Sequence, residues 1–263
     1  MKWVKGFLIN LQFFTSIPIP FQIPMDKEHL EKAIKTFPLL GLMQGGIYAG
    51  ILYSFLHWTP FSDLTTAFAV WLTIILLTGG IHLDGWMDTS DAFFSYQDKE
   101  KRLEIMSDPR TGAFGVLSVI VLLSARFLFI YEVTQMAQPI SYFLIALIPF
   151  FSKIVMGELL LNVKTAKKGG LGSLFKQAAS ENPLSFYVIY SVVLLGMTAV
   201  FLNNALWGVL LFLFVAGGVI ALLKKKVVNW FGGMTGDVLG ASVEGTEVLL
   251  WMTLWLFHYF VMG

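Results

Sequence analysis

The chain has 263 residues, of which 56% are hydrophobic and 13% are charged, and its mean hydropathy is +0.72. Soluble domains carry about 25% charged residues, so this composition predicts an integral membrane protein, here a single domain over residues 1–263. The net charge of +1 indicates no nucleic-acid partner, and the absence of cysteine excludes disulfides and thiolate metal sites.

The N-terminal segment, residues 1–20, has a basic start and an apolar body that Asn10 and Gln12 interrupt. No small-residue cleavage pattern precedes Pro18, so we predict an interfacial amphipathic helix and not a cleaved signal peptide. The helix is expected to end at the turn formed by residues 17–20, because proline cannot continue a helix.

Seven apolar stretches follow, each near the roughly 20 residues that a helix needs to cross a bilayer. They predict an all-α membrane bundle of about seven transmembrane helices; six or eight result if the last stretch or the N-terminal helix is interpreted differently. The expected spans cover residues 36–58, 62–82, 113–135, 138–161, 184–203, 205–223 and 246–262.

The lysines and arginines predict the orientation, because cytoplasmic loops are enriched in them. With the N-terminus inside, sixteen of the eighteen fall in the N-terminal segment and the inner loops, and only Arg126 and Lys153 lie within spans. Nearly all carboxylates fall on the same side. We therefore expect a multi-pass protein of the cell membrane with its N-terminus and its active site, built from cytoplasmic loops, inside the cell.

The first acidic stretch, GGIHLDGWMDTSDAFFS, covers residues 79–95. On a helix, Asp84, Asp88 and Asp91 would share one face and repel one another. A Mg²⁺ ion, which prefers carboxylate and phosphate oxygens, would make that arrangement favourable. The alternative is a solvated acidic helix end. His82 is either a base for a hydroxyl nucleophile or a hydrogen-bonded structural residue.

The second acidic stretch, GGMTGDVLGASVEGTE, covers residues 232–247 and contributes Asp237, Glu244 and Glu247. Its glycines, among them Gly236 and Gly240, allow the backbone to approach either another helix or phosphate oxygens. Helix packing alone does not explain three carboxylates. We therefore predict an all-oxygen metal or phosphate site built from both acidic stretches.

Three further charged residues are candidates for the same site. Arg110 suits a phosphate, or it anchors the chain at the inner leaflet, and Asp108 is either a ligand or orients Arg110. Lys153, at membrane depth, either meets a phosphate in a cavity or only neutralises a carboxylate. The neutralising pairs would be Lys153–Glu158 and Arg126–Glu132.

Five stretches together resemble the cobalamin synthase family of adenosylcobinamide-GDP ribazoletransferases, and they are spread over essentially the whole chain. They are FLINLQFFTSIPIP, FPLLGLMQG, GGIHLDGWMDTSDAFFS, IMSDPRTGAFGV and GGMTGDVLGASVEGTE. The chain departs from the family at residues 93–96, where the family is glycine-rich, and at Lys153, where the family tends to have arginine.

The resemblance implies a Mg²⁺-dependent membrane enzyme of late cobalamin biosynthesis. It would join adenosylcobinamide-GDP to α-ribazole, or to α-ribazole 5′-phosphate, and release GMP. On this hypothesis the catalytic residues are His82, Asp84, Asp88, Asp91, Asp237 and Glu244. The residues that bind substrate or phosphate are Asp108, Arg110, Lys153 and Gly236. The metal ligands are Asp84, Asp88, Asp91, Asp237 and Glu247.

Two other functions are alternatives. A CDP-alcohol phosphotransferase-like enzyme also uses aspartates at the inner leaflet, but Trp86-Met87 here replaces its usual Ala-Arg after the first Asp-Gly pair. An ion-coupled transporter would account for the charges at membrane depth, yet the chain shows no internal repeat. The sequence leaves the oligomeric state open, a homo-oligomer included.

Overall fold

The computed structural model describes residues 2–167, 169–179 and 184–262, which are almost entirely helical. Within these ranges the only β-type pairing is an isolated parallel bridge between Thr165 and Met234. The predicted all-α class is confirmed.

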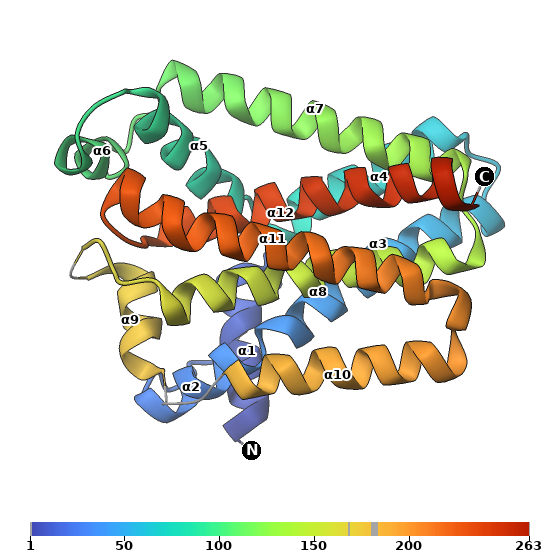
Figure 1. The fold of residues 1–263 in the computed structure, drawn as a ribbon, viewed down its shortest axis with the longest axis horizontal. Helices are drawn as coiled ribbons and strands as arrows, with labels where there is room; N and C mark the ends of the chain where they lie inside the picture. Colours follow the sequence, from blue (N-terminus) through green and yellow to red (C-terminus); the bar gives the residue numbers. More distant parts are fainter. Residues whose placement is uncertain (1, 168, 180–183, 263) are drawn as a thin grey trace.

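Seven long helices run along the molecule and form the bundle in Figure 1. They are α3 (Phe37–Trp58), α4 (Asp63–Thr78), α7 (Ala113–Gln135), α8 (Pro139–Asn162), α10 (Leu184–Phe201), α11 (Leu206–Phe231) and α12 (Gly236–Phe257). The shorter helices are α1 (Lys2–Phe14), α2 (Lys27–Lys35), α5 (Ile81–Phe94), α6 (Lys99–Ile105) and α9 (Gly170–Ala178), with a 3₁₀ turn at Asn203–Ala205 and a π turn at His258–Met262.

Four of the described helices, α3, α7, α8 and the helical stretch Asn203–Phe231, are long and apolar enough to cross a membrane. The pair α4 and α5 makes a fifth candidate if it is counted as one broken span, and α10 is a shorter apolar helix. The protein is thus a polytopic membrane protein, as predicted, while seven crossings remain a prediction.

Three predicted spans have different bounds in the structure, and the one expected over 205–223 is part of the longer helix α11, which ends at Phe231. The span expected over 62–82 ends at Thr78, because Gly79 and Gly80 adopt φ angles of 63° and 78° and the chain bends by 85° before α5. The helix that contains the span expected from 246 begins ten residues earlier, at Gly236, where the Thr235 side chain caps it. Both acidic stretches are therefore helical, and the expected cytoplasmic loops do not supply the carboxylates of the site.

Helix α8 is the centre of the bundle, and α3, α11 and α12 pack around it. Of its most apolar 18-residue stretch, 83% is buried inside the protein. Helix α3 approaches α8 through glycine. A Cβ atom on Gly45 would lie 2.2 Å from the carbonyl oxygen of Ala146, and one on Gly41 would lie 2.3 Å from that of Pro149. The α3–α8 contact is therefore backbone against backbone.

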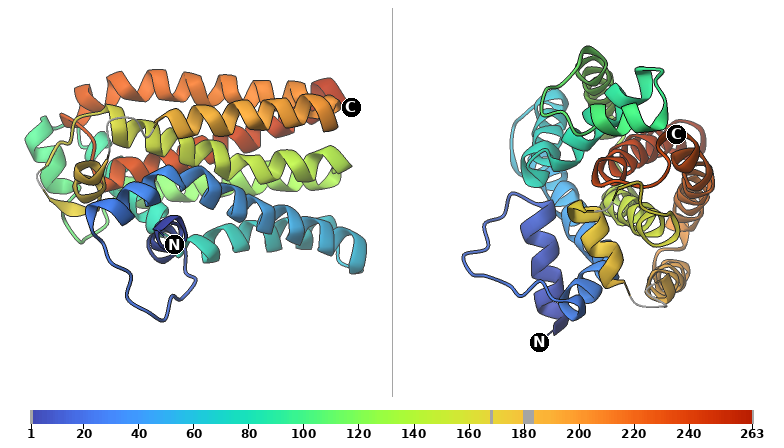
Figure 2. Two further views of the ribbon diagram at one scale, coloured as in Figure 1. Left: turned by 90° about the horizontal axis from the view of Figure 1, so that it is seen from below. Right: turned by 90° about the vertical axis from the view of Figure 1, so that its left-hand side faces the viewer.

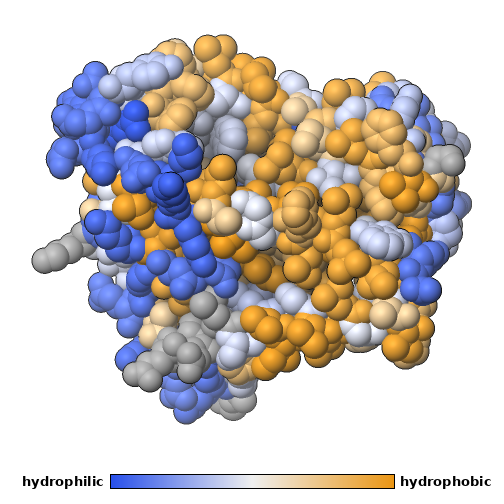
Figure 3. All heavy atoms as spheres, viewed as in Figure 1, coloured by the Kyte–Doolittle hydropathy of each residue, from blue (hydrophilic) through white to orange (hydrophobic). Residues whose placement is uncertain are grey.

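The short helices gather at one end of the bundle, which Figure 3 shows as its most hydrophilic part. Helix α1 lies across the long helices, the orientation expected of an interfacial helix (Figures 1 and 2). It ends at Phe14, before the predicted turn, and the Asn10 amide fixes it to α2 by donating to Ala33 O at 2.8 Å and Thr36 Oγ1 at 2.9 Å.

The α3–α8 contact predicts that Gly45→Ala lowers the thermal stability of the detergent-purified protein. The added methyl group overpacks the helix pair, at a cost of about 1–3 kcal/mol. The matched control is Gly46→Ala, where a Cβ meets nothing within 4 Å. Because alanine favours helix over glycine, the control should melt at or above the wild-type temperature. Equal melting temperatures for both variants would contradict this packing.

Candidate active site

Helices α5 and α12 cross close to the polar end of the bundle, and glycines make their close approach possible. A Cβ atom on Gly85 would lie 2.7 Å from the carbonyl oxygen of Asp237, and one on Gly240 would lie 3.2 Å from Cα of His82. Gly236, by contrast, faces open space. The small-residue packing interpretation thus holds for Gly240, and the crossing brings the two acidic stretches together.

A cavity of about 280 Å³ opens beside this crossing. Its lining contains Asp84 from α5 and Asp237 from α12, together with Lys167 and the glycine-rich residues 169–172 at the start of α9. Several aromatic rings also line it. The lining includes Phe14, Phe37, His82, Asp84, Lys167, Gly169, Gly170, Gly172, Phe175, Thr235, Gly236 and Asp237.

Asp84 and Asp237 line the cavity, and both interact with the neighbouring carboxylate of Asp88, which is not part of the lining. The pKa of Asp88 is raised to about 7 by partial burial, and then by the neighbouring charges of Asp84, Asp237 and Asp91. Burial also raises the pKa of Asp237. The side chains of Asp84 and Asp88 have no hydrogen-bond or salt-bridge partner within the described ranges. These carboxylates therefore have free oxygens that can bind a cation.

The carboxylates do not surround a common point. In the part of the chain that the structure describes, no group of three or more His, Cys, Asp or Glu side chains is arranged to hold a metal ion. The donors themselves are hard oxygens next to open space at Gly236, which fits Mg²⁺, an ion that usually completes its shell with water and substrate phosphate. The residues fit that ion if the substrate supplies the remaining ligands.

Asp91, the third aspartate of the stripe, is already engaged. Its two oxygens accept the backbone N–H groups of Gly112 at 2.7 Å and Gly115 at 2.8 Å, at the start of α7. A Cβ on either glycine would collide with this carboxylate. The structure therefore makes Asp91 a side-chain cap that fixes α7 on α5.

Glu244 and Glu247 lie deeper in the bundle than Asp237. At about 1.5 Å per residue, Glu247 is roughly 15 Å along α12 from Asp237. Glu244 forms a buried ion pair with Arg126, and Glu247 accepts a hydrogen bond from Ser152 at 3.2 Å. The structure does not bring these two glutamates to the aspartates, and their predicted role as ligand or base gains no support from this geometry.

Lys153 is buried and lies 2.8 Å, Nζ to Nε2, from His82, whose ring stacks on Phe14 at 5.6 Å. A lysine ammonium can only donate, so Nε2 accepts and is not free to receive a substrate proton. This contact favours the structural role of His82. The expected neutralising pairs of the spans are wrong, because Arg126 pairs with Glu244 and Glu158 pairs with Lys224 at 2.9 Å.

Arg110 stands at the polar end in the loop between α6 and α7, with 86% of its side chain exposed. Asp108 accepts from its Nε at 2.9 Å and from its Nη2 at 2.7 Å. This pairing holds the pKa of Asp108 down at about 2. Asp108 therefore orients Arg110, as one of the two interpretations expected, and leaves the remaining N–H groups of the guanidinium free for an anion.

The sequence comparisons match this chain over nearly its full length. The model of the cobalamin-5-phosphate synthase family matches residues 6–255. The chain belongs to this family. Curated relatives are named adenosylcobinamide-GDP ribazoletransferase. That of Geobacillus sp. (strain WCH70) is 39% identical over 260 residues, covering 98% of each chain, and that of Clostridioides difficile (strain 630) is 33% identical over 268 residues, covering 98% of this chain and 100% of its own. No solved structure matches.

Membership of the cobalamin-5-phosphate synthase family confirms the resemblance seen in the sequence. The family match extends through both acidic stretches. It is therefore preferred to the two alternative interpretations, a CDP-alcohol phosphotransferase-like enzyme and an ion-coupled transporter.

Lys167 and the segment 169–172 also line the cavity, and they were not among the residues predicted for the site. Gly169 and Gly170 have φ angles of 105° and 77°, which only glycine adopts readily. The signal was present as Lys167-Lys168-Gly169-Gly170, since lysine beside glycines at a helix start is typical of phosphate sites. Phe14 and Phe175 had no signal, because their roles depend on packing between distant helices.

The buried Arg126–Glu244 pair predicts a large loss of stability for Arg126→Met. Removing one partner of a buried pair leaves an uncompensated charge, at a cost of about 3–5 kcal/mol. The double variant Arg126→Met/Glu244→Met should recover much of the loss in thermal unfolding experiments. Arg110→Met, which breaks an exposed pair, is the control and should change little. A single Arg126→Met variant as stable as wild type would contradict the buried pairing.

Proposed function

We propose that the protein joins adenosylcobinamide-GDP to α-ribazole, or to α-ribazole 5′-phosphate, and releases GMP, in a Mg²⁺-dependent reaction on the cytoplasmic side of the cell membrane. The observation that carries the proposal is the placement of Asp84 and Asp237 at one cavity, in a chain whose curated relatives are named adenosylcobinamide-GDP ribazoletransferase. Family membership supports the reaction, and the cavity supports the residues assigned to it.

The reaction is a displacement at phosphorus. A ribose hydroxyl of α-ribazole attacks the phosphorus that carries the cobinamide arm, the bond to the bridging oxygen breaks, and GMP leaves. Such displacements depend on alignment and on neutralisation of the phosphate charge. Bound Mg²⁺ would supply that neutralisation at the pyrophosphate, and Asp84 and Asp88 are the residues that would hold it, which leaves Asp237 for proton transfer.

Other residues of the cavity are suited to the anionic and planar parts of the substrates. Lys167 and the backbone N–H groups at the start of α9 would bind phosphate oxygens, and the remaining donors of the exposed Arg110 would bind a phosphate outside the cavity lining. The rings of Phe14, Phe37 and Phe175 pack against one another with centroids 5.6 to 6.1 Å apart and would stack a base.

Asp237 is the carboxylate best placed to accept the proton of the attacking hydroxyl. It lines the cavity, whereas Glu244 is neutralised by Arg126. Its raised pKa makes it a better proton acceptor than an ordinary aspartate.

We predict that Asp84→Asn and Asp88→Asn each reduce GMP release from adenosylcobinamide-GDP and α-ribazole by about 100-fold or more, the scale of losing one electrostatic group at such a centre. EDTA should abolish the wild-type activity, and added Mg²⁺ should restore it. Asp63→Asn is the control, since Asp63 lies in the first turn of α4, in the half of the bundle opposite the short helices. Full activity of Asp88→Asn, or of wild type in excess EDTA, would refute the metal assignment.

The proposed orientation is tested with single cysteines, because the chain has none of its own. Gln97 lies in the polar end and Phe61 in the turn between α3 and α4, and both side chains are exposed. With the site in the cytoplasm, a membrane-impermeant maleimide should label the Gln97→Cys variant in inverted vesicles only. It should label Phe61→Cys in right-side-out vesicles only. The opposite pattern would reverse the topology.

A further inference from the structure

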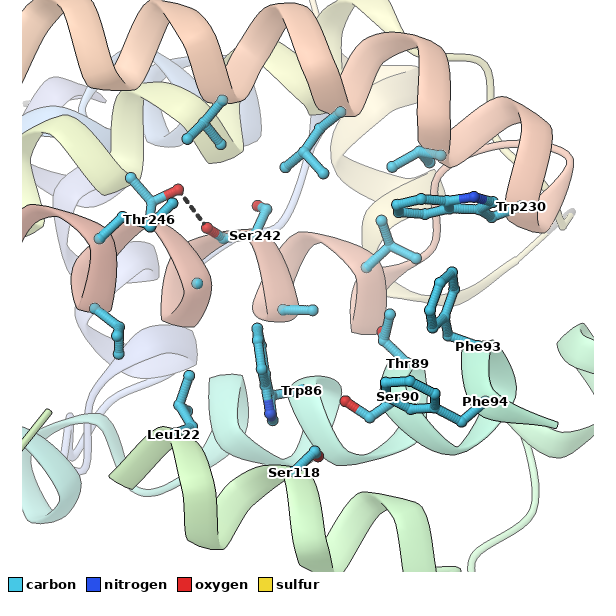
Figure 4. Close-up of a pocket in the computed structure, with 18 of the residues that line it drawn as sticks. Trp86, Thr89, Ser90, Phe93, Phe94, Ser118, Leu122, Trp230, Ser242 and Thr246 are labelled. Carbon is cyan, nitrogen blue, oxygen red and sulfur yellow. Dashed lines mark hydrogen bonds between the residues drawn. The ribbon is translucent and has the colours of Figure 1, made fainter. Parts of the chain in front are cut away.

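A second cavity, of about 720 Å³, lies on the other side of α5 from the carboxylates. Helices α7 and α11 form its two walls, and α5 and α12 form its floor (Figure 4). No charged side chain lines it among the described residues, and its walls are hydrocarbon and aromatic. Representative lining residues are Trp86, Phe94, Leu117, Val121, Leu222 and Leu249. We call this cavity the α7–α11 groove.

The α7–α11 groove faces the bilayer. Helices α7 and α11 are both membrane-span candidates. In each, only 22% of the most apolar 18-residue stretch is buried inside the protein. Each packs on α12, and the two stand apart above the groove. An apolar space between two lipid-facing helices is reached laterally from the hydrocarbon region, so hydrocarbon is the chemistry that it accepts.

The polar end of the groove is cationic. Phe93 and Trp230 line the groove there, and the Arg102 guanidinium lies 5.6 Å from the centroid of the Phe93 ring. The Lys226 ammonium lies at the same distance from the ring of Trp230. Arg102 Nη1 donates to the backbone oxygen of Trp230 at 3.2 Å, while its Nε is buried without a partner.

We propose that the α7–α11 groove binds an anionic phospholipid, with an acyl chain between α7 and α11 and the phosphate against Arg102 and Lys226. The apolar walls match the chain, and the cations at one end match the headgroup. Aromatic residues such as Trp230 are common at this depth, where hydrocarbon meets the headgroups. The proposal does not depend on the reaction catalysed at the carboxylates.

The same geometry argues against a substrate whose apolar part would occupy the α7–α11 groove. The groove opens toward the bilayer, and α5 separates it from the cavity that holds Asp84 and Asp237. A water-soluble substrate would enter from the polar end, where Phe93 and Trp230 pack together with ring centroids 4.8 Å apart.

The test is native mass spectrometry of the full chain, purified in mild detergent and given an equimolar mixture of phosphatidylglycerol and phosphatidylcholine. Wild type should retain phosphatidylglycerol at least about threefold over phosphatidylcholine, because the rim favours a net negative headgroup. Arg102→Gln/Lys226→Gln should abolish the preference but still bind lipid. Lys27→Gln, an exposed lysine elsewhere at the polar end, should keep it.

The groove itself is tested by filling it. Ala241→Trp, on the floor, should reduce lipid retention severalfold, and Val219→Trp, on the α11 wall, provides a second variant if the first does not fold. Val193→Trp on the exposed face of α10 is the matched control and should retain lipid as wild type does. Equal retention of the two lipids by wild type, retention unaffected by a filled groove, or displacement of the lipid by adenosylcobinamide-GDP would overturn the proposal.

Discussion

The close approach of α5 to α12 is the constraint on which the site depends. Side chains at Gly85 or Gly240 would force the helices apart, since a Cβ on Gly85 would fall 2.7 Å from the backbone of Asp237. With glycine at both positions, the carboxylates of Asp84 and Asp237, which are 153 residues apart in the sequence, meet at one cavity. Their mutual repulsion opposes the contact, and packing of the two helices holds the carboxylates together.

Buried polar contacts deep in the bundle hold the helices of this site in place. Arg126 of α7 pairs with Glu244 of α12, Ser152 of α8 donates to Glu247, and Lys153 of α8 contacts His82 of α5. A charge at membrane depth is costly without a partner, so any shift of one helix that broke a pair would be strongly unfavourable. The deep charges therefore fix the relative positions of four helices, and the carboxylates near the surface remain free for chemistry.

The sequence predicted what is local and missed what depends on long-range contacts. The predicted bounds of α3, α7 and α8 agree with those of the structure to within one residue, because each apolar run has a clear polar or proline boundary. The sequence also predicted that Asp84 and Asp237 lie at one site, because both acidic stretches were expected on the same side of the membrane. Asp91 could not be assigned, since its partners lie 21 and 24 residues away, in a turn whose path only the folded chain defines. Glu247 follows Asp237 and Glu244 at helical spacing, but it lies too deep in the bundle to line the cavity.

The two faces of α5 line two different cavities. After the 85° bend at Gly79 and Gly80, one face of α5 directs Asp84 into the polar cavity, and the other places Trp86 and Phe93 in the α7–α11 groove. In a soluble enzyme a protein core would support that second face. An acyl chain in the groove, as proposed, would take the place of such a core and would make the position of the aspartates depend on the bilayer. That dependence would give a physical reason for the proposed reaction to take place at a membrane.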